Sequence, residues 1–404
     1  MNKPLLPPAP PFASYLPALG PLVLIFFLNF TSRILISPLG VPIQNDLGAS
    51  AAAVGSLFFY TAIGAAISMI SSSLVTSRLS HRRTILLSTF ALAGPLLFAA
   101  GSDSVGGLAA SCFCLGLVAG VYVPSGMALV TTIAPPAHWG KALAVHELAP
   151  TTGFVLAPVL AELALAFSGW RLVLVIQAVL TTGAALIFLA RGRGGEFTGR
   201  APDLALLSRV VRRPAFAILV LVIGLAMGAT MAPYGMLPLY LVHEHGYLRP
   251  QANQLLALSR FSGVPMVFLA GFLADRLGTR TTMALSLAAM GLLTVGLGLG
   301  RGNHLLAAVL LQPLVSVCFF PAGYATIAQL FEPELRSLAM SLVSPLAVAL
   351  GLGLIPYGIG ILADAGHFSA AFVSLGIAVL ASLAVLSRLE RPTPARLDTE
   401  RCRN

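Results

Sequence analysis

Charged residues are scarce in this sequence of 404 residues. Asp, Glu, Lys and Arg together make up only 9% of the chain, whereas soluble domains carry about a quarter. Hydrophobic residues make up 57% of it, and the mean hydropathy is +0.91. This balance excludes an ordinary soluble domain, and the length leaves room for roughly a dozen apolar helices of about 20 residues each.

Cysteine is nearly absent as well. Cys112, Cys114 and Cys318 lie in apolar runs and Cys402 lies in the C-terminal tail, which is typical of small buried side chains rather than of a disulfide framework. Cys112 and Cys114 lack the spacing of a metal site. The sequence also lacks a phosphate-binding Gly-Lys-Ser/Thr motif and a nucleophile elbow. We therefore expect no cofactor, no metal site and no enzymatic activity.

Acidic residues are outnumbered by basic ones, which gives a net charge of +10. A positive charge is compatible with a nucleic-acid partner, but the arginines lie at the ends of apolar runs instead of gathering in one basic domain. We therefore expect no nucleic-acid partner. The environment that this pattern predicts is a lipid bilayer.

Apolar runs between charge clusters predict an all-α membrane protein with twelve transmembrane helices. Gly and Pro inside several runs do not argue against helices, because neighbouring membrane helices can satisfy the freed backbone groups. The predicted spans cover residues 17–40, 52–75, 84–102, 106–133, 142–166, 171–190, 215–242, 252–274, 281–300, 305–331, 337–363 and 369–387.

Basic residues lie mostly on one side of this arrangement. With both termini inside, only Arg171, Arg249 and Arg301 fall in outer loops. Because Lys and Arg accumulate in cytoplasmic loops, we expect a multi-pass protein of the cell inner (plasma) membrane with both termini cytoplasmic.

The two parts of the chain repeat each other at an offset of about 195 to 198 residues. Residues 122–128 (YVPSGMA) match residues 319–325 (FFPAGYA), and residues 141–145 (KALAV) match residues 336–340 (RSLAM). This repeat predicts two pseudo-symmetric six-helix bundles. The predicted domains are a cytoplasmic tail over 1–16, the N-terminal bundle over 17–190, a cytoplasmic linker over 191–214, the C-terminal bundle over 215–387 and a cytoplasmic tail over 388–404.

A short basic turn joins the eighth and ninth spans. Residues 271–280 (GFLADRLGTR) resemble the signature loop of the major facilitator superfamily, Gly-x-x-x-Asp-Arg-x-Gly-x-Arg. The resemblance implies two bundles around a central cavity that opens alternately to each side of the membrane. In that family the aspartate contacts a helix N-terminus of the other half and closes the cytoplasmic side. The residues that this implies for conformational gating are Gly271, Asp275, Arg276, Gly278 and Arg280.

The first half carries a degenerate copy of this loop in residues 73–82. Arg78 and Arg82 are retained, and we include them among the gating residues, but Ser77 stands at the position of the aspartate. We therefore expect a weaker latch from this copy.

Ionisable side chains inside the spans indicate function, because each is costly in a bilayer unless it faces a partner or a wet cavity. Arg33 lies in the first span, in a setting that resembles organic-anion symporters of the superfamily, and Arg260 comes from the other half. An arginine presents donors that suit a carboxylate or phosphate. The alternative is that Arg260 pairs with Glu162. The candidate substrate-binding residues are Arg33, Arg260, Asn29, Tyr122, Tyr234, Gln312 and Tyr324.

The fifth span carries the candidates for proton coupling, which are Glu147, His146 and Glu162. A carboxylate or an imidazole can bind and release a proton as access alternates. The alternative for Glu147 and His146 is a water-exposed position in the first cytoplasmic turn, at the positive end of the helix.

The function that these features predict is secondary active transport of a small organic anion, coupled to protons or by exchange. One alternative is a proton-coupled multidrug or metabolite exporter, which the partial motif Gly153-x-x-x-Ala157-Pro158 favours. Another is a membrane sensor or scaffold that does not transport. Small-residue motifs also serve helix packing alone. The expected partners are a small-molecule substrate, a proton or counter-ion and the bilayer, and the chain is expected to be a monomer.

Overall fold

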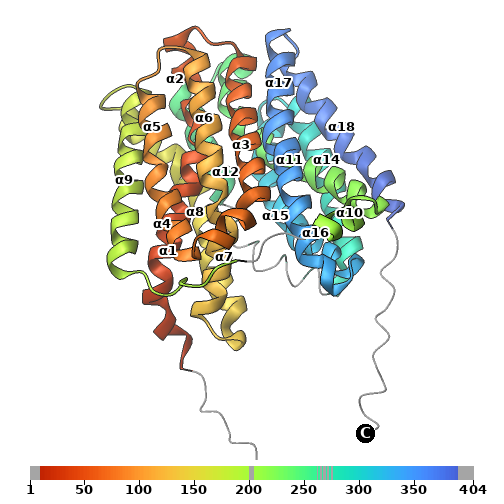
Figure 1. Cartoon of the computed structure of the whole chain (residues 1–404). Helices are drawn as coiled ribbons and strands as arrows, with labels where there is room; N and C mark the ends of the chain where they lie inside the picture. The colour runs from red at the N-terminus through yellow and green to blue at the C-terminus, as the bar shows by residue number, and fades with distance from the viewer. Residues whose placement is uncertain are drawn as a thin grey trace, which may run out of the picture.

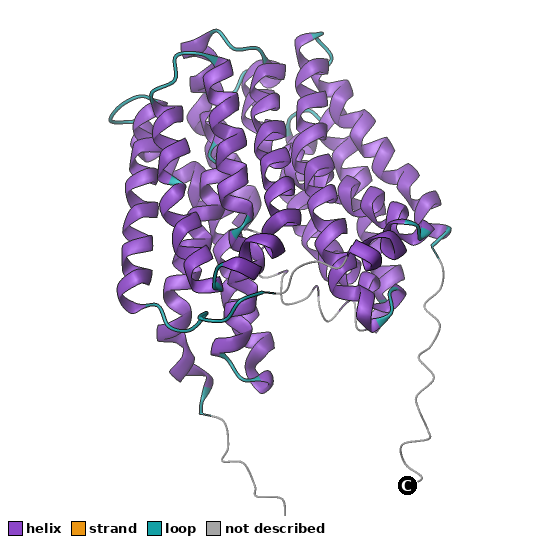
Figure 2. Cartoon of the chain, in the orientation of Figure 1, coloured by secondary structure: helices purple, strands orange, loops and turns teal. Residues whose placement is uncertain are grey.

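The computed structural model describes residues 10–199, 204–261 and 276–389, together with residues 263, 266, 270 and 273. These residues are almost entirely helical (Figure 2), as expected where no water is present to satisfy backbone groups. Eleven helical segments in the described part of the chain are long and apolar enough to cross a membrane. The predicted all-α, multi-pass architecture is confirmed. The expected span 252–274 begins as α12 (Arg249–Phe261) and continues beyond the described residues.

The helices of the first half follow the six predicted spans, several of them as two consecutive segments. They are α1 (Leu16–Ile34) with α2 (Ile36–Leu47), α3 (Ala51–Arg78), α4 (His81–Ala91) with α5 (Ala93–Ala100), α6 (Val105–Gly120) with α7 (Tyr122–Ile133), α8 (Trp139–Leu165) and α9 (Trp170–Arg191).

The second half repeats this order. Its helices are α11 (Pro214–His245), α12, α14 (Thr279–Leu299), α15 (Asn303–Leu330), α16 (Pro333–Val348), a π-helical turn (Ala349–Leu354) that continues into α17 (Ile355–Asp364), and α18 (Phe368–Ser387).

Serine residues start several helices. Ser50, Ser80 and Ser104 precede α3, α4 and α6, and each side chain accepts a hydrogen bond from the backbone N–H three residues further on. Such caps satisfy donors that the first helical turn leaves without a partner. The helix boundaries therefore follow from local sequence, and they place the short loops at the two ends of the molecule.

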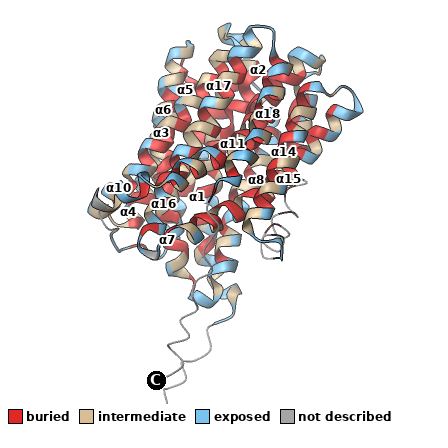
Figure 3. Ribbon diagram, turned by 90° about the vertical axis from the view of Figure 1, so that its right-hand side faces the viewer, coloured by how far each residue is buried: buried red, intermediate tan, exposed pale blue. Residues whose placement is uncertain are grey.

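Glycine sets the closest helix contact in the first half, between α3 and α6. A Cβ atom at Gly64 would lie 2.9 Å from the backbone nitrogen of Leu117, and one at Gly116 would lie 2.8 Å from that of Ala65. Small residues let membrane helices approach to backbone contact. Large apolar side chains such as Leu163 and Val179 are instead exposed, which is the pattern of a surface in contact with lipid. Figure 3 shows the buried residues on the inner faces of the helices.

The two halves lie side by side (Figure 1) and meet through α2 with α11, α3 with α16 and α17, and α8 with α12. Both described chain ends lie at one end of the molecule. We call this the terminal end and the opposite one the distal end.

The linker over 191–214 contains a short helix, α10 (Leu204–Val211), which contacts α16. Arg209 and Arg213 pair with Glu332 of the second half at 3.2 and 2.7 Å. Residues 195–199 instead bond through their backbone to the loop between α3 and α4. Each part of the linker that the structure describes is therefore attached to one of the halves.

Candidate functional site

Arg260 is a buried cation held between two aromatic rings. Its side chain is only 7% exposed, and its guanidinium carbon lies 5.1 Å from the ring centre of Phe154 and 5.0 Å from that of Tyr234. Its Nη2 donates a hydrogen bond to the Thr230 carbonyl at 2.9 Å, whereas its Nε has no hydrogen-bond partner in the described residues. Cation–π contacts stabilise the charge, but they leave donors available in the plane of the group.

Glu162 does not provide the counter-charge that we considered for Arg260. The structure pairs it instead with Arg249, at 3.1 Å from Nη2. Among the described residues no carboxylate forms an ion pair with Arg260. That alternative explanation is therefore wrong for Arg260.

Arg33 lies in α1 of the other half and also has no ion pair within the described part of the chain. Its guanidinium carbon lies 5.4 Å from the ring centre of Phe30, and its Nε is buried without a hydrogen-bond partner. Phe30 contacts Phe154 edge to face at 4.8 Å between ring centres, and Phe154 contacts Tyr234 in the same way at 4.9 Å. The three rings connect the two arginines across the interface, and we call them the aromatic bridge.

The candidate amides brace neighbouring helices in each half. Asn29 donates from Nδ2 to the Ala119 carbonyl at 3.1 Å, and Gln312 donates from Nε2 to the Ala229 carbonyl. Both side chains are buried, and neither side-chain oxygen has a partner in the described residues. Buried acceptors of this kind normally have a partner, such as water or a ligand.

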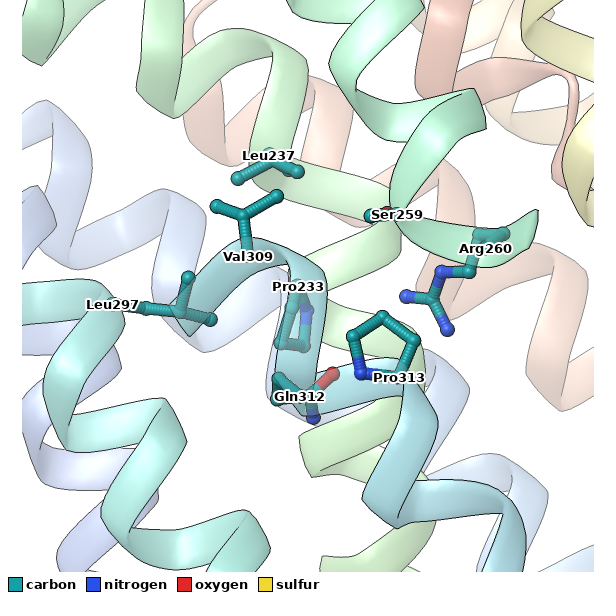
Figure 4. Close-up of a pocket in the computed structure, with 8 residues that line it drawn as sticks. All are labelled: Pro233, Leu237, Ser259, Arg260, Leu297, Val309, Gln312 and Pro313. Carbon is teal, nitrogen blue, oxygen red and sulfur yellow. The ribbon is translucent and has the colours of Figure 1, made fainter. Parts of the chain in front are cut away.

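Gln312 and Arg260 line the same small cavity, of about 10 Å³, in the second half. Figure 4 shows the Arg260 side chain extending toward Pro313, with Gln312 next to it in sequence and in space. A cavity of this size is close to the limit for one water molecule. It is therefore too small to be the substrate site by itself.

Tyr122 lies apart from the arginines, inside the first half. Its hydroxyl donates to the Leu22 carbonyl at 3.0 Å and lies 3.0 Å from Nε2 of His146. The His146 ring is fully buried and stacks on Phe26 at 4.4 Å. This position differs from the water-exposed alternative that we considered for His146.

Glu147 connects this cluster to the other half. Its half-exposed carboxylate lies 3.7 Å from Nδ1 of His146. It also acts electrostatically on the hydroxyls of Tyr122 and of Tyr324, which belongs to α15 of the second half. The structure thus brings together Glu147, His146 and Tyr122, and brings Tyr324 within electrostatic reach.

The distal end carries two carboxylates that each contact the start of a helix in the other half. Glu162, at the end of α8, binds Arg249 and accepts from Asn253 Nδ2 at 2.6 Å, both in α12. Asp364, at the end of α17, accepts from the backbone N–H groups of Ala51 and Ala52 at 2.7 and 2.9 Å. A carboxylate at a helix N-terminus is stabilised by the unsatisfied N–H groups and the helix dipole.

Further polar contacts join the halves on the same side. Ser37 donates to the Tyr234 carbonyl at 2.6 Å, and His243 Nε2 donates to Gln44 Oε1 at 2.8 Å. Asn253 also donates to the Pro38 carbonyl at 3.1 Å. We call these contacts, together with those of Glu162 and Asp364, the distal contacts.

The signature loop lies only partly within the described residues. Gly271 and Asp275, including the proposed latch of Asp275, lie outside them. Gly278 has φ +81°, a conformation that favours glycine, directly before α14. Arg276 lies at the end of the preceding segment, and Arg78 is exposed at the end of α3.

Arg280 and Arg82 occupy equivalent places in the two halves. Arg280 donates to carbonyls at the end of α18, among them Ser387 at 2.6 Å, and Arg82 donates to Gly192 at 2.5 Å and Leu189 at 3.1 Å, at the end of α9. Each arginine therefore caps the last helix of its own half, where free carbonyls and the helix dipole favour a cation.

Sequence reasoning missed several residues of this site. Asp364 could have been recognised, because it is an acid near the end of the eleventh span, as Glu162 is near the end of the fifth. Phe30 and Phe154 carry no such signal, since the chain contains 22 phenylalanines. In the described residues, no group of three or more His, Cys, Asp or Glu side chains gathers to hold a metal.

Solved structures with a similar fold are transporters. A mutant of the nucleoside transporter NupG has a TM-score of 0.79 at 14% identity, with 93% of this chain and 100% of that one covered. A mutant of the peptide transporter POT has a TM-score of 0.77 at 15% identity, with 91% and 93% covered. A bacterial homologue of the human lysosomal transporter Spinster, in an inward-facing and unoccupied conformation, has a TM-score of 0.74 at 19% identity, with 94% and 95% covered.

Sequence comparison identifies the family. No curated protein sequence matches this chain. A sequence profile of the Major Facilitator Superfamily, however, matches residues 22–311 and, in a second match, residues 221–403. Together these matches cover nearly the whole chain, and the chain belongs to the Major Facilitator Superfamily.

Proposed function

We propose that this chain is a secondary transporter that carries a small organic anion across the inner (plasma) membrane, coupled to protons or by exchange, and that it is not an enzyme. The observation that carries this proposal is the pair Arg33 and Arg260, which come from opposite halves and form no ion pair in the described residues. Guanidinium groups stay charged at any working pH. A charge inside a membrane protein needs a partner, and a bound anion would supply it.

The distal contacts support alternating access. They lie between the level of Tyr234 and the distal end, and they hold the halves together there. With both termini in the cytoplasm, this arrangement corresponds to a state closed toward the outside, from which the site is reached through the terminal end. The halves over 17–190 and 215–387 would move against each other, with the linker over 191–214 and the cytoplasmic tails over 1–16 and 388–404 outside the bundles. Asp275 and the other signature-loop residues would close the terminal end in the opposite state.

The cluster of His146 and Glu147 supports proton coupling. If the Tyr122 hydroxyl donates to Leu22, its oxygen accepts from Nε2 of His146, so that Nδ1 is the atom left to take up a proton. A proton at Nδ1 would face the Glu147 carboxylate at 3.7 Å. The resulting ion pair would change the charge at the surface of α8 that faces Tyr324. Glu162 would couple differently, because its protonation would break the distal ion pair with Arg249.

Uptake into proteoliposomes under an imposed pH gradient tests this function. Labelled monocarboxylates and dicarboxylates are compared with lipophilic cations, using the wild type, Arg33→Gln and the control Arg301→Gln, which changes an exposed arginine of a distal loop. We expect carboxylate uptake that follows the gradient, falls at least tenfold in Arg33→Gln and persists in Arg301→Gln.

Transport of lipophilic cations that Arg33→Gln leaves unchanged would contradict the anion proposal. It would favour the multidrug exporter. No movement of any of these solutes would favour the sensor or scaffold.

A further inference from the structure

Phe154 is the central ring of the aromatic bridge. It extends from α8 and contacts Phe30 of its own half, Tyr234 of the other half and the guanidinium of Arg260. The neighbouring Gly153 permits this arrangement, because a Cβ atom there would lie 3.0 Å from the Phe30 ring. Phe154 therefore lies between the two arginines and touches the immediate surroundings of both.

The two sides of Phe154 differ in accessibility. Arg33, Phe30 and Phe154 are partly exposed, whereas Tyr234 and Arg260 are buried. An anion that reaches this region meets Arg33 and the two phenylalanine rings first. Arg260 lies behind Phe154 and Tyr234, and it becomes reachable when these rings move.

The geometry of a guanidinium also limits how an anion can approach. Its donors point outward in the plane of the group, and a carboxylate binds them edge to edge. Phe30 covers one face of Arg33, so a carboxylate bound in that plane places its substituent beside the rings of Phe30 and Phe154. Ring pairs gain energy beyond the area that they bury, worth roughly a two- to tenfold change in affinity.

From this geometry we propose that the site prefers anions that carry a flat, unsaturated ring next to the carboxylate, and that Phe154 sets this preference. The proposal rests on the anion transport proposed above and adds the substrate class. A saturated ring of similar size has the same charge and the same apolar area, but it lacks the quadrupole that the edge-to-face contact with an aromatic ring requires. The selectivity therefore depends on the aromatic ring and not on size.

The test compares benzoate with cyclohexanecarboxylate, which have the same number of carbons and one carboxylate each. Their affinities are measured by direct binding of labelled compound to the purified full-length protein. We expect the wild type to bind benzoate several-fold more tightly. Phe154→Leu removes this ratio with similar binding of cyclohexanecarboxylate, whereas Phe154→Tyr, which keeps a ring, retains it. Arg33→Gln weakens the binding of both compounds.

A matched control is Phe188→Leu, since Phe188 forms a cation–π contact with Arg82 at 5.3 Å, away from the site. It should keep the wild-type ratio. If Phe154→Leu does not elute as a monodisperse protein, Phe30→Leu makes the same test on the neighbouring ring. Equal affinities in the wild type, or an unchanged ratio in both leucine variants, overturn the proposal while leaving anion transport standing. Absence of binding of either compound to the wild type overturns both.

Discussion

The distal and terminal ends of the interface between the halves are built differently. At the distal end, carboxylates, amides and backbone groups join one half to the other, as in the pairs of Glu162 with Arg249 and of Asp364 with the start of α3. At the terminal end, Arg82 and Arg280 form their contacts inside their own halves. The difference teaches that this structure is held closed at one end by contacts that can be broken one at a time.

The distal contacts also follow the internal repeat. Glu162 and Asp364 lie near the ends of α8 and α17, the fifth span of each half, and each contacts the first turn of the second span of the other half. The contacts thus form a pseudo-symmetric pair. The chemistry is not identical, because Glu162 uses side-chain partners and Asp364 uses backbone N–H groups.

The largest effect on this comparison should come from Gly360→Ala. A Cβ atom at Gly360 would lie 2.5 Å from the Ala51 carbonyl oxygen and 2.7 Å from the Ala52 Cα, whereas one at the control position Gly358 has nothing within 4 Å. Overpacking of this kind costs about 1–3 kcal/mol, and it opposes closure of the distal end. We expect benzoate uptake to fall roughly tenfold in Gly360→Ala and to stay unchanged in Gly358→Ala. Equal rates in the two variants would contradict the closeness of α3 and α17.

A smaller effect should follow from Asp364→Asn. The amide keeps the shape but loses the charge at the N-terminus of α3, which is worth about 0.3–1 kcal/mol at a helix end. The distal end should therefore open more often by a factor of roughly two to five. Labelling of a single cysteine introduced at Ala52 measures this opening, and a labelling rate equal to the wild type would show that the carboxylate does not hold the end closed.

Glu162→Gln should have a smaller effect again. The pair with Arg249 is partly exposed, and such pairs contribute about 1 kcal/mol or less, while the new amide can still accept from Asn253. We expect an additive response when Glu162→Gln is combined with Asp364→Asn, because the two contacts share no partner. Strong coupling between them in a double-mutant cycle would show that the two distal contacts act as one unit.

The smallest effect at the distal end should come from changes at the terminal end. Arg280→Lys keeps the charge but loses the fork that reaches several carbonyls of α18. We expect a thermal stability lower by about 1 kcal/mol or less, with the distal labelling rate unchanged. A changed labelling rate would mean that the capping arginines also control the gate.

Much of the fold could be predicted from the sequence, because the bilayer forces apolar runs of spanning length into helices. Arg33 and Arg260 were also recognisable, since intramembrane charges are rare. Their surroundings were not. The partner of Glu162 depends on which helices meet at the distal end, and the choice of Arg249 over Arg260 is decided by tertiary packing. Phe154 could not be distinguished from packing residues, because its role depends on contacts with Phe30 and Tyr234 from other helices.

The central claim is that the distal end is closed while the arginine site is reached from the terminal end. Electron-spin distance measurements between labels at Asn45 and His367, across the distal end, and between labels at Ala137 and Glu334, across the terminal end, test it most directly in liposomes. All four positions are exposed. Without substrate, the account predicts one short, narrow distribution for the distal pair and a longer, broader one for the terminal pair. A distal pair that is mainly long, with a short terminal pair, would contradict it.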